Sequence, residues 1–209
     1  MDLVIAHYNC NIDWIQNINT SYTIYLYSKT IPSQEFILNN KIAYIVHQEL
    51  NKGNEASAYL QYIIDKYDSL PEYVLFVHDH ETSWHHEGSI INIINSYKGA
   101  NYINLNKYGT ESLYEKFLSD GVLWKVDDYM DSAQSAFENP PHIMKLDYNS
   151  CAQFAVSRKV IRSRSKEFYK RALQYIIDTS KSTEHNSRVL EYYWRWIFIH
   201  DAALSDKYK

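Results

Sequence analysis

"NEASAYLQYIIDKYDSLPEYVLFVHDHE", residues 54–81, contains a helix pattern followed by a strand pattern. Apolar side chains recur from Ala56 to Tyr67 at intervals of three and four residues, which is the spacing of one face of an α-helix. Pro71 lies just beyond the expected end of that helix. Residues 73–78 form a short continuous apolar run, which is typical of a buried strand. The stretch therefore predicts one helix–strand unit of an α/β fold.

The residues before this unit continue the alternation of strands and helices. Three further runs have the composition of strands, and Asn11 is in a position to cap a short helix that carries three isoleucines. Strands that alternate with helices imply a largely parallel sheet, and ligands of such sheets bind beyond the carboxyl ends of the strands. The predicted strands are residues 3–7, 22–28 and 41–49.

The second half of the chain is less regular but follows the same scheme. Residues 110–120, a segment capped by Ser165, and an aromatic stretch over 187–200 have helical patterns, whereas residues 151–157 have the composition of a strand. Two prolines place residues 138–142 in a loop. We expect one domain over residues 1–209 with a Rossmann-like α/β fold, in which helices flank a mixed, mostly parallel central sheet.

Composition and charge make several classes of function less plausible for this chain. The chain of 209 residues has 21 basic and 25 acidic residues and a net charge of −4, which disfavours nucleic acid as the main partner. Its five glycines form neither GxGxxG nor a P-loop. Two cysteines, no signal peptide and no membrane-spanning run predict a soluble cytoplasmic protein.

Carboxylates and histidines follow the strand at 73–78. Asp79 and Glu81 can reach one cation from a tight turn, and oxygen ligands of this kind suit Mg²⁺ or Mn²⁺. Imidazole ligands would shift the preference toward Mn²⁺ or Zn²⁺. The alternative is a solvated loop whose acids cap the next helix. The histidines of this stretch are His78, His80, His85 and His86.

Three other residues have both a functional and a structural interpretation. Asn54 opens the predicted helix, where free N–H groups suit a phosphate or a sugar hydroxyl, or where it is an ordinary N-cap. Glu55 beside it would repel an anion and so favours a neutral sugar. Trp84 either stacks on a sugar ring or anchors its loop in the core. Glu191 is either a base or an exposed helical acid.

A resemblance to known proteins extends over nearly the whole chain. The segments "VIAHYNCNIDWI", "NEASAYLQYIIDKYDSLPEYVLFVHDH", "SWHH", "CAQFAVSRKVI" and "LEYYWRWIF" resemble a domain family shared by fungi and large DNA viruses. The resemblance is greatest to N-terminal glycosyltransferase domains of multidomain proteins from chlorella-infecting viruses. "DHE" at 79–81 resembles the Asp-x-Asp metal motif of GT-A glycosyltransferases, with Glu81 in place of the second Asp.

The resemblance implies a GT-A-like fold, a UDP-sugar donor, and Mn²⁺ or Mg²⁺ as cofactor. Metal ligands would be Asp79 and Glu81, together with His80 and a late histidine, either His185 or His200. Gln153 and Glu191 would border the sugar and acceptor as catalytic residues. The implied nucleotide-sugar-binding residues are Ala6, His7, Tyr8, Asn9, Lys29, Asn54, Ser57, Asp79, Trp84 and His85.

The implied activity is transfer of a sugar to a glycan or glycoprotein, by resemblance a viral capsid glycan made in the host cytoplasm. The viral relatives imply retention of configuration, whereas inversion would need a base such as Glu191. The resemblance is compatible with residues 1–209 being the N-terminal domain of a longer protein. Two alternatives from the residues themselves are a metal-dependent phosphoesterase or nuclease and a non-catalytic module that binds carbohydrate or nucleotide.

Overall fold

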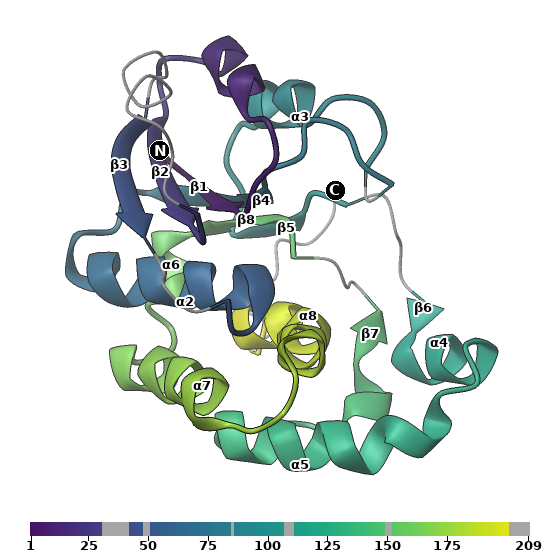
Figure 1. The fold of residues 1–209 in the computed structure, drawn as a ribbon. Helices are drawn as coiled ribbons and strands as arrows, with labels where there is room; N and C mark the ends of the chain where they lie inside the picture. The colour runs from purple at the N-terminus through teal and green to yellow at the C-terminus, as the bar shows by residue number, and fades with distance from the viewer. Residues whose placement is uncertain (31–41, 48–50, 85, 107–110, 149–151, 201–209) are drawn as a thin grey trace.

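The structure, a computed structural model, describes residues 1–30, 42–47, 51–84, 86–106, 111–148 and 152–200. Its centre is a six-stranded sheet with the strand order β3-β2-β1-β4-β8-β5 (Figure 1). This arrangement confirms the predicted α/β fold. The strands are β1 (Asp2–His7), β2 (Thr23–Ser28), β3 (Ile42–His47), β4 (Tyr73–His78), β5 (Tyr102–Asn104) and β8 (Phe154–Ser157).

The sheet is mixed and mostly parallel, as the sequence predicts. β1 pairs in parallel with β2 and β4, and β2 pairs in parallel with β3. β8 is antiparallel to both of its neighbours, β4 and β5. Ala6 near the end of β1 pairs with Tyr27 on one side and His78 on the other, so the carboxyl ends of three strands meet at one edge.

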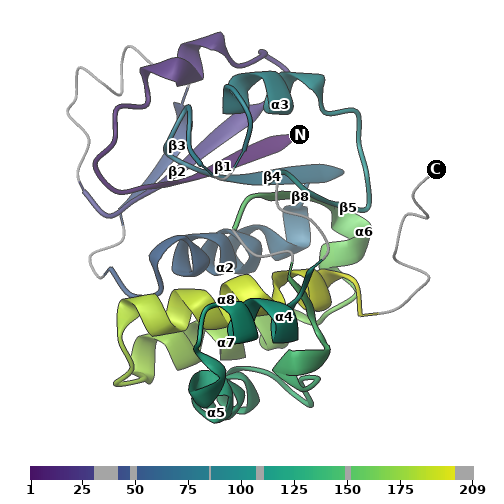
Figure 2. The same cartoon turned by 90° about the vertical axis from the view of Figure 1, so that its right-hand side faces the viewer.

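The two faces of the sheet bury separate hydrophobic cores. Side chains of a strand point alternately to opposite faces, so Leu3 and Ile5 belong to one core and Val4 between them to the other. One face is covered by the 3-10 helix η1 (Asp13–Asn17) and by α3 (Ile90–Ser96). The opposite face is covered by α2 (Asn54–Lys66), with the other helices beneath it (Figure 2).

Those other helices form a second layer under α2. They are α4 (Leu113–Ser119), α5 (Val126–Ala136), α6 (Arg158–Ile161), α7 (Lys166–Asp178) and α8 (Thr183–Phe198). Short elements connect them: η2 (Tyr67–Ser69), η3 (Leu123–Lys125), η4 (Ile143–Lys145), and a two-stranded ladder of β6 (Glu111–Ser112) with β7 (Asp147–Tyr148). Figure 2 shows α7 and α8 directly below α2, α4 at a similar distance from the sheet, and α5 farther from it.

The N-caps of the helices agree in part with those predicted from the sequence. Ser165 caps α7, as predicted, and accepts a hydrogen bond from the Phe168 N–H. Ile12 occupies the N-cap position of η1, but the Asn11 side chain accepts a hydrogen bond from the Asp13 N–H, so Asn11 caps this short helix as predicted. One cap prediction is wrong, because Gly53 rather than Asn54 is the N-cap of α2. The Asn54 side chain instead donates a hydrogen bond to Ser187 of α8. A residue far away in the sequence therefore binds the side chain that the local pattern predicted to be a helix cap.

Gly53 is the position where backbone conformation and packing are both restrictive. Its φ of +71° lies in the left-handed region, and a Cβ there would lie 2.8 Å from Cγ2 of Ile176 on α7. We expect Gly53→Ala to lower the free energy of unfolding by about 1–2 kcal/mol through the backbone and by about 1–3 kcal/mol more through the clash.

Gly88 is the matched control for this experiment. Its φ of +67° is nearly the same, but a Cβ would meet nothing within 4 Å. Gly88→Ala should therefore show the backbone cost alone. Urea denaturation of both variants measures the difference, and equal losses would show that Ile176 moves aside without cost.

The described residues contain no helix that is both long enough and apolar enough to cross a membrane. This agrees with the expectation from the sequence that the chain has no membrane span.

Candidate functional site

A cavity of about 340 Å³ lies beyond the carboxyl ends of β1, β2 and β4. Its walls come from the residues that end these strands and from the first turn of α2, so four elements meet there. This is the edge at which open α/β sheets bind ligands. Lining residues are Ala6, His7, Tyr8, Lys29, Asn51, Asn54, Glu55, His78, Asp79 and His80, and we call this space the sheet-edge cavity.

Asp79 is the best-anchored acid of the sheet-edge cavity. One carboxylate oxygen, Oδ2, accepts hydrogen bonds from the backbone N–H groups of Tyr8 at 2.9 Å and Cys10 at 3.4 Å. Its backbone carbonyl accepts from the indole of Trp14. The side chain is almost buried, yet it lines the cavity. The adjacent strands β1 and β4 thus fix the carboxylate and direct it toward the ligand space.

Cys10, Asp79 and His80 are the one group of potential metal ligands within the described residues. Cys10 Sγ lies 3.2 Å from His80 Nδ1, and Asp79 Oδ1 lies 3.6 Å from His80 Nε2. Burial, followed by the neighbouring Asp79 carboxylate, raises the pKa of the Cys10 thiol, so it is a neutral and weak ligand at pH 7. The carboxylate and imidazole that remain fit Mn²⁺ better than Mg²⁺.

The structure separates Glu81 from this group. The Glu81 carboxylate is exposed and accepts a hydrogen bond from Ser89 at 3.1 Å, beside the start of α3. Its backbone carbonyl accepts from the N–H of Ile90. Glu81 therefore supports the loop before α3, which is the capping alternative raised by the sequence.

The other histidines occupy different surroundings. His7 contacts Ser28 Oγ at 2.7 Å and the Cys10 carbonyl at 3.1 Å. His185 contacts Ser132 Oγ at 2.8 Å and stacks on Tyr129, far from Asp79 in the fold, and burial lowers its pKa. His200 is exposed after the end of α8. His85 lies outside the described residues.

Lys29 supplies a positive charge to the sheet-edge cavity. Its ammonium donates a hydrogen bond to Ser57 Oγ at 2.8 Å, and Ser57 donates in turn to the Asn54 carbonyl. Burial lowers the pKa of Lys29 to about 8. The sequence-based candidates Lys29, Asn54 and Ser57 are thereby brought together, whereas Asn9 is exposed and does not line the cavity.

Two buried carboxyl groups lie where the sheet-edge cavity meets α8. Glu191 Oε2 accepts a hydrogen bond from Arg188 at 3.0 Å. Burial is the main cause that raises the pKa of both Glu55 and Glu191, and the charge of Glu191 raises that of Glu55 further. Arg188 acts in the opposite direction on both groups, and it also donates a hydrogen bond to Glu191.

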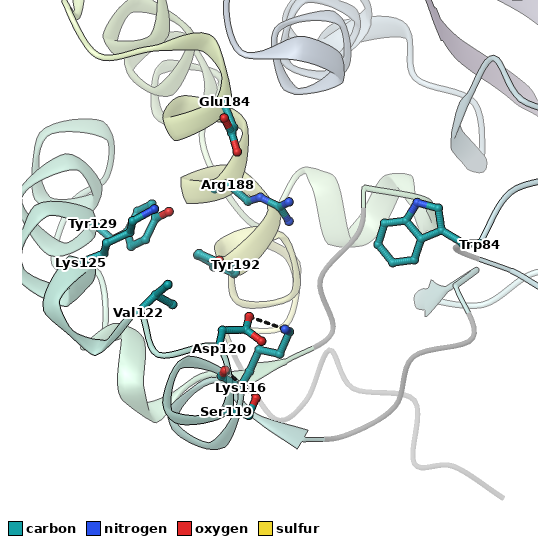
Figure 3. A pocket seen from close by; sticks show the side chains of 10 residues that line it. All are labelled: Trp84, Lys116, Ser119, Asp120, Val122, Lys125, Tyr129, Glu184, Arg188 and Tyr192. Carbon is teal, nitrogen blue, oxygen red and sulfur yellow. Dashed lines mark hydrogen bonds and ion pairs between the residues drawn. The ribbon is translucent and has the colours of Figure 1, made fainter.

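A second and larger cavity, about 560 Å³, lies beside α8. Glu184, Arg188 and Tyr192 follow each other along one face of α8, and Trp84 lies opposite them (Figure 3). The Lys116–Asp120 ion pair of α4 forms part of the rim. Asn54 of the sheet-edge cavity bonds to Ser187 of α8, and the next residue along that helix, Arg188, lines the second cavity, so one hydrogen bond connects a wall of each. We call this space the helical cavity.

Trp84 and Gln153, two further candidates from the sequence, differ in their exposure to solvent. Trp84 is 59% exposed and lines the helical cavity, so it is not part of the hydrophobic core. Gln153 is buried: its side chain accepts a hydrogen bond from the His78 N–H and donates one to Asn106. Gln153 thus holds the end of β4 and lines neither cavity described here.

Sequence reasoning missed Cys10 and Arg188, and it noted Glu55 only as a charge beside Asn54 and not as a group that interacts with Glu191. Arg188 precedes Glu191 by three residues, and this spacing alone could have suggested their helical ion pair. For Glu55 the sequence contains no such signal, because its partner lies on an element more than a hundred residues later.

Comparison with known proteins identifies the family of this chain. A family model described as "Protein of unknown function (DUF3431)" matches residues 3–209. The chain therefore belongs to this family, and the matched residues include the central sheet and the helices that flank it. The search of curated proteins and the search of solved structures found no match.

Proposed function

We propose that the protein is a metal-dependent glycosyltransferase of GT-A type that transfers a sugar from a UDP-sugar to a hydroxyl group of a glycan or glycoprotein. The observation that carries the proposal is the pair of cavities whose walls are connected by the hydrogen bond between Asn54 and Ser187. One has an anchored carboxylate and a lysine at the carboxyl ends of parallel strands, and the other has an exposed tryptophan. Two substrates that react with each other need two such spaces.

The sheet-edge cavity suits the donor. Asp79 and His80 would hold the Mn²⁺ ion, which when bound neutralises the charge that develops on the diphosphate leaving group. Lys29 would pair with a phosphate oxygen from the opposite wall. Ala6, His7 and Tyr8 line the same space at the end of β1 and would contact the nucleotide.

The helical cavity suits the acceptor. Trp84 offers a ring face on which a sugar can stack, and the charged residues of α4 and α8 can bond its hydroxyl groups. Glu191, which accepts a hydrogen bond from Arg188 of the helical cavity, would be the base for the acceptor proton if the configuration inverts. The resemblance to viral domains supports retention and a viral capsid glycan as the acceptor, with the reaction in the host cytoplasm.

A donor screen tests the proposal. UDP and several UDP-sugars are titrated by calorimetry with and without Mn²⁺, and slow hydrolysis of each UDP-sugar is followed in parallel. We expect UDP to bind only with Mn²⁺ and one donor to be hydrolysed. Tight sugar binding without metal would indicate a carbohydrate-binding module instead. Cleavage of a generic phosphodiester would indicate a phosphoesterase.

A further inference from the structure

Glu55 has a buried carboxyl oxygen that the fold leaves available to a ligand. Its Oε1 is shielded from solvent and makes no hydrogen bond with any residue that the structure describes. The side chain nevertheless lines the sheet-edge cavity, beside Asn54 and across from Asp79. An unsatisfied buried polar atom costs on the order of 1–3 kcal/mol, so such an atom in a ligand cavity points to a bond made by the ligand.

The charge state of Glu55 determines which ligand atom it can bind. Burial is the main cause that raises the pKa of Glu55 to about 8, and the negative charge of Glu191 is the next. Its own backbone N–H, Arg188 and Lys29 act in the opposite direction with smaller effects. At neutral pH the group is therefore a carboxylic acid that can both donate and accept a hydrogen bond.

We propose that Glu55 is a neutral carboxyl group that binds a hydroxyl of the donor sugar in the sheet-edge cavity. This inference rests on the proposed function and names the group that recognises the sugar rather than the nucleotide. A hydroxyl matches the group because each can donate one bond to the other and accept one from it. The proposal also removes the conflict seen in the sequence, where a charged Glu55 would repel the diphosphate.

The charges around Glu55 divide the cavity into two parts. On one side are the ionisable groups of the strand ends, which suit the metal and the phosphates: His7, Lys29, His78, Asp79 and His80. On the side of α8 are Glu191 and Arg188, which neutralise each other. Tyr59, one turn along α2, is buried and neutral because burial raises its pKa well above the ordinary value. The charges that act on Glu55 are thus of both signs, negative from Glu191 and positive from Arg188 and Lys29, and they offset each other in part.

A pair of variants tests the inference by calorimetry with UDP, UDP-glucose and UDP-galactose in the presence of Mn²⁺. Glu55→Gln keeps a donor and an acceptor at the same place, whereas Glu55→Ala keeps neither. We expect UDP affinity to be unchanged in both. The additional affinity of the better UDP-sugar over UDP should fall about tenfold in Glu55→Ala and stay within about threefold in Glu55→Gln.

The outcomes distinguish this inference from the proposed function. If UDP binds with Mn²⁺ but the UDP-sugars respond equally to both variants or to neither, the inference is wrong and the proposed function stands. If neither UDP nor either UDP-sugar binds the wild-type protein, the proposed function fails and the inference fails with it. A pH series adds a further check, since wild type should lose the sugar contribution above pH 8 and Glu55→Gln should not.

Thermal unfolding supplies a readout that needs no ligand. Glu55 is protonated in the folded state at pH values where the unfolded chain has already ionised it, so its burial destabilises the fold increasingly as pH rises from about 5 through 8. Glu55→Gln removes this ionisation. Its melting temperature should match wild type at pH 5 and exceed it at pH 9. Equal pH dependence in the two proteins would contradict a neutral Glu55.

Discussion

Asp79→Asn should abolish Mn²⁺-dependent UDP binding and lower the transfer rate by at least about 100-fold, the scale seen when one stabilising group of a transition state is removed. Asparagine has the same shape and can still accept the hydrogen bonds of the Tyr8 and Cys10 N–H groups, so the strand ends should keep their arrangement. The negative charge that would hold the cation is lost. Calorimetry with UDP and Mn²⁺ measures the effect, and circular dichroism checks the fold.

Glu81→Gln is the matched control, because it removes a carboxylate two residues away. The sequence predicts both acids as metal ligands, but the Glu81 carboxylate bonds to Ser89 beside α3. We expect its UDP affinity to stay within about threefold of wild type, since an exposed hydrogen bond contributes on the order of 0.5 kcal/mol. An equal loss of UDP affinity in both variants would show that both acids bind the metal ion, as the sequence predicts. Normal UDP binding by Asp79→Asn would show that the donor does not bind at Asp79.

Phe154→Ala should lower the free energy of unfolding by about 3–5 kcal/mol, the range for a large aromatic side chain removed from a core. Phe154 is 1% exposed and lies in the centre of an aromatic cluster beneath the sheet. Its ring centroid is 5.2 Å from those of Trp194 and Phe198 on α8 and 5.1 Å from that of Phe76 on β4. Its removal loosens the contact between α8 and the sheet on which both cavities depend.

Trp124→Ala is the control for aromatic loss without burial. Trp124 is 77% exposed on η3, so its replacement should change the free energy of unfolding by no more than about 0.5 kcal/mol. Urea denaturation with a common m-value compares the two variants. If Phe154→Ala unfolds with a loss below about 1.5 kcal/mol, neighbouring rings fill the space and the cluster is more adaptable than its geometry indicates.

The sequence by itself determined the α/β architecture and the side of the sheet on which a ligand site forms. The helical periodicity before Tyr67 and the apolar run of β4 are local patterns. The first is typical of a helix that buries one face, as α2 does, and the second of a strand that is buried on both faces, as β4 is. The position of Asp79 directly after a buried strand was enough to place it at the carboxyl edge. These results follow from neighbours in the chain.

Only the tertiary structure decided which of the polar groups at that edge act together. Asp79 bonds to the loop after β1, about seventy residues earlier, and Asn54 bonds to Ser187 on α8. The pKa of Glu55 is raised because burial desolvates its carboxyl group and because the charge of Glu191, from a distant helix, acts on it. Glu81, adjacent to the same loop, instead bonds to Ser89. The packing of the sheet against the helices determines which of these groups become partners. Hydrogen bonds and desolvation depend on distances in space, and the spacing of residues along the sequence does not determine those distances.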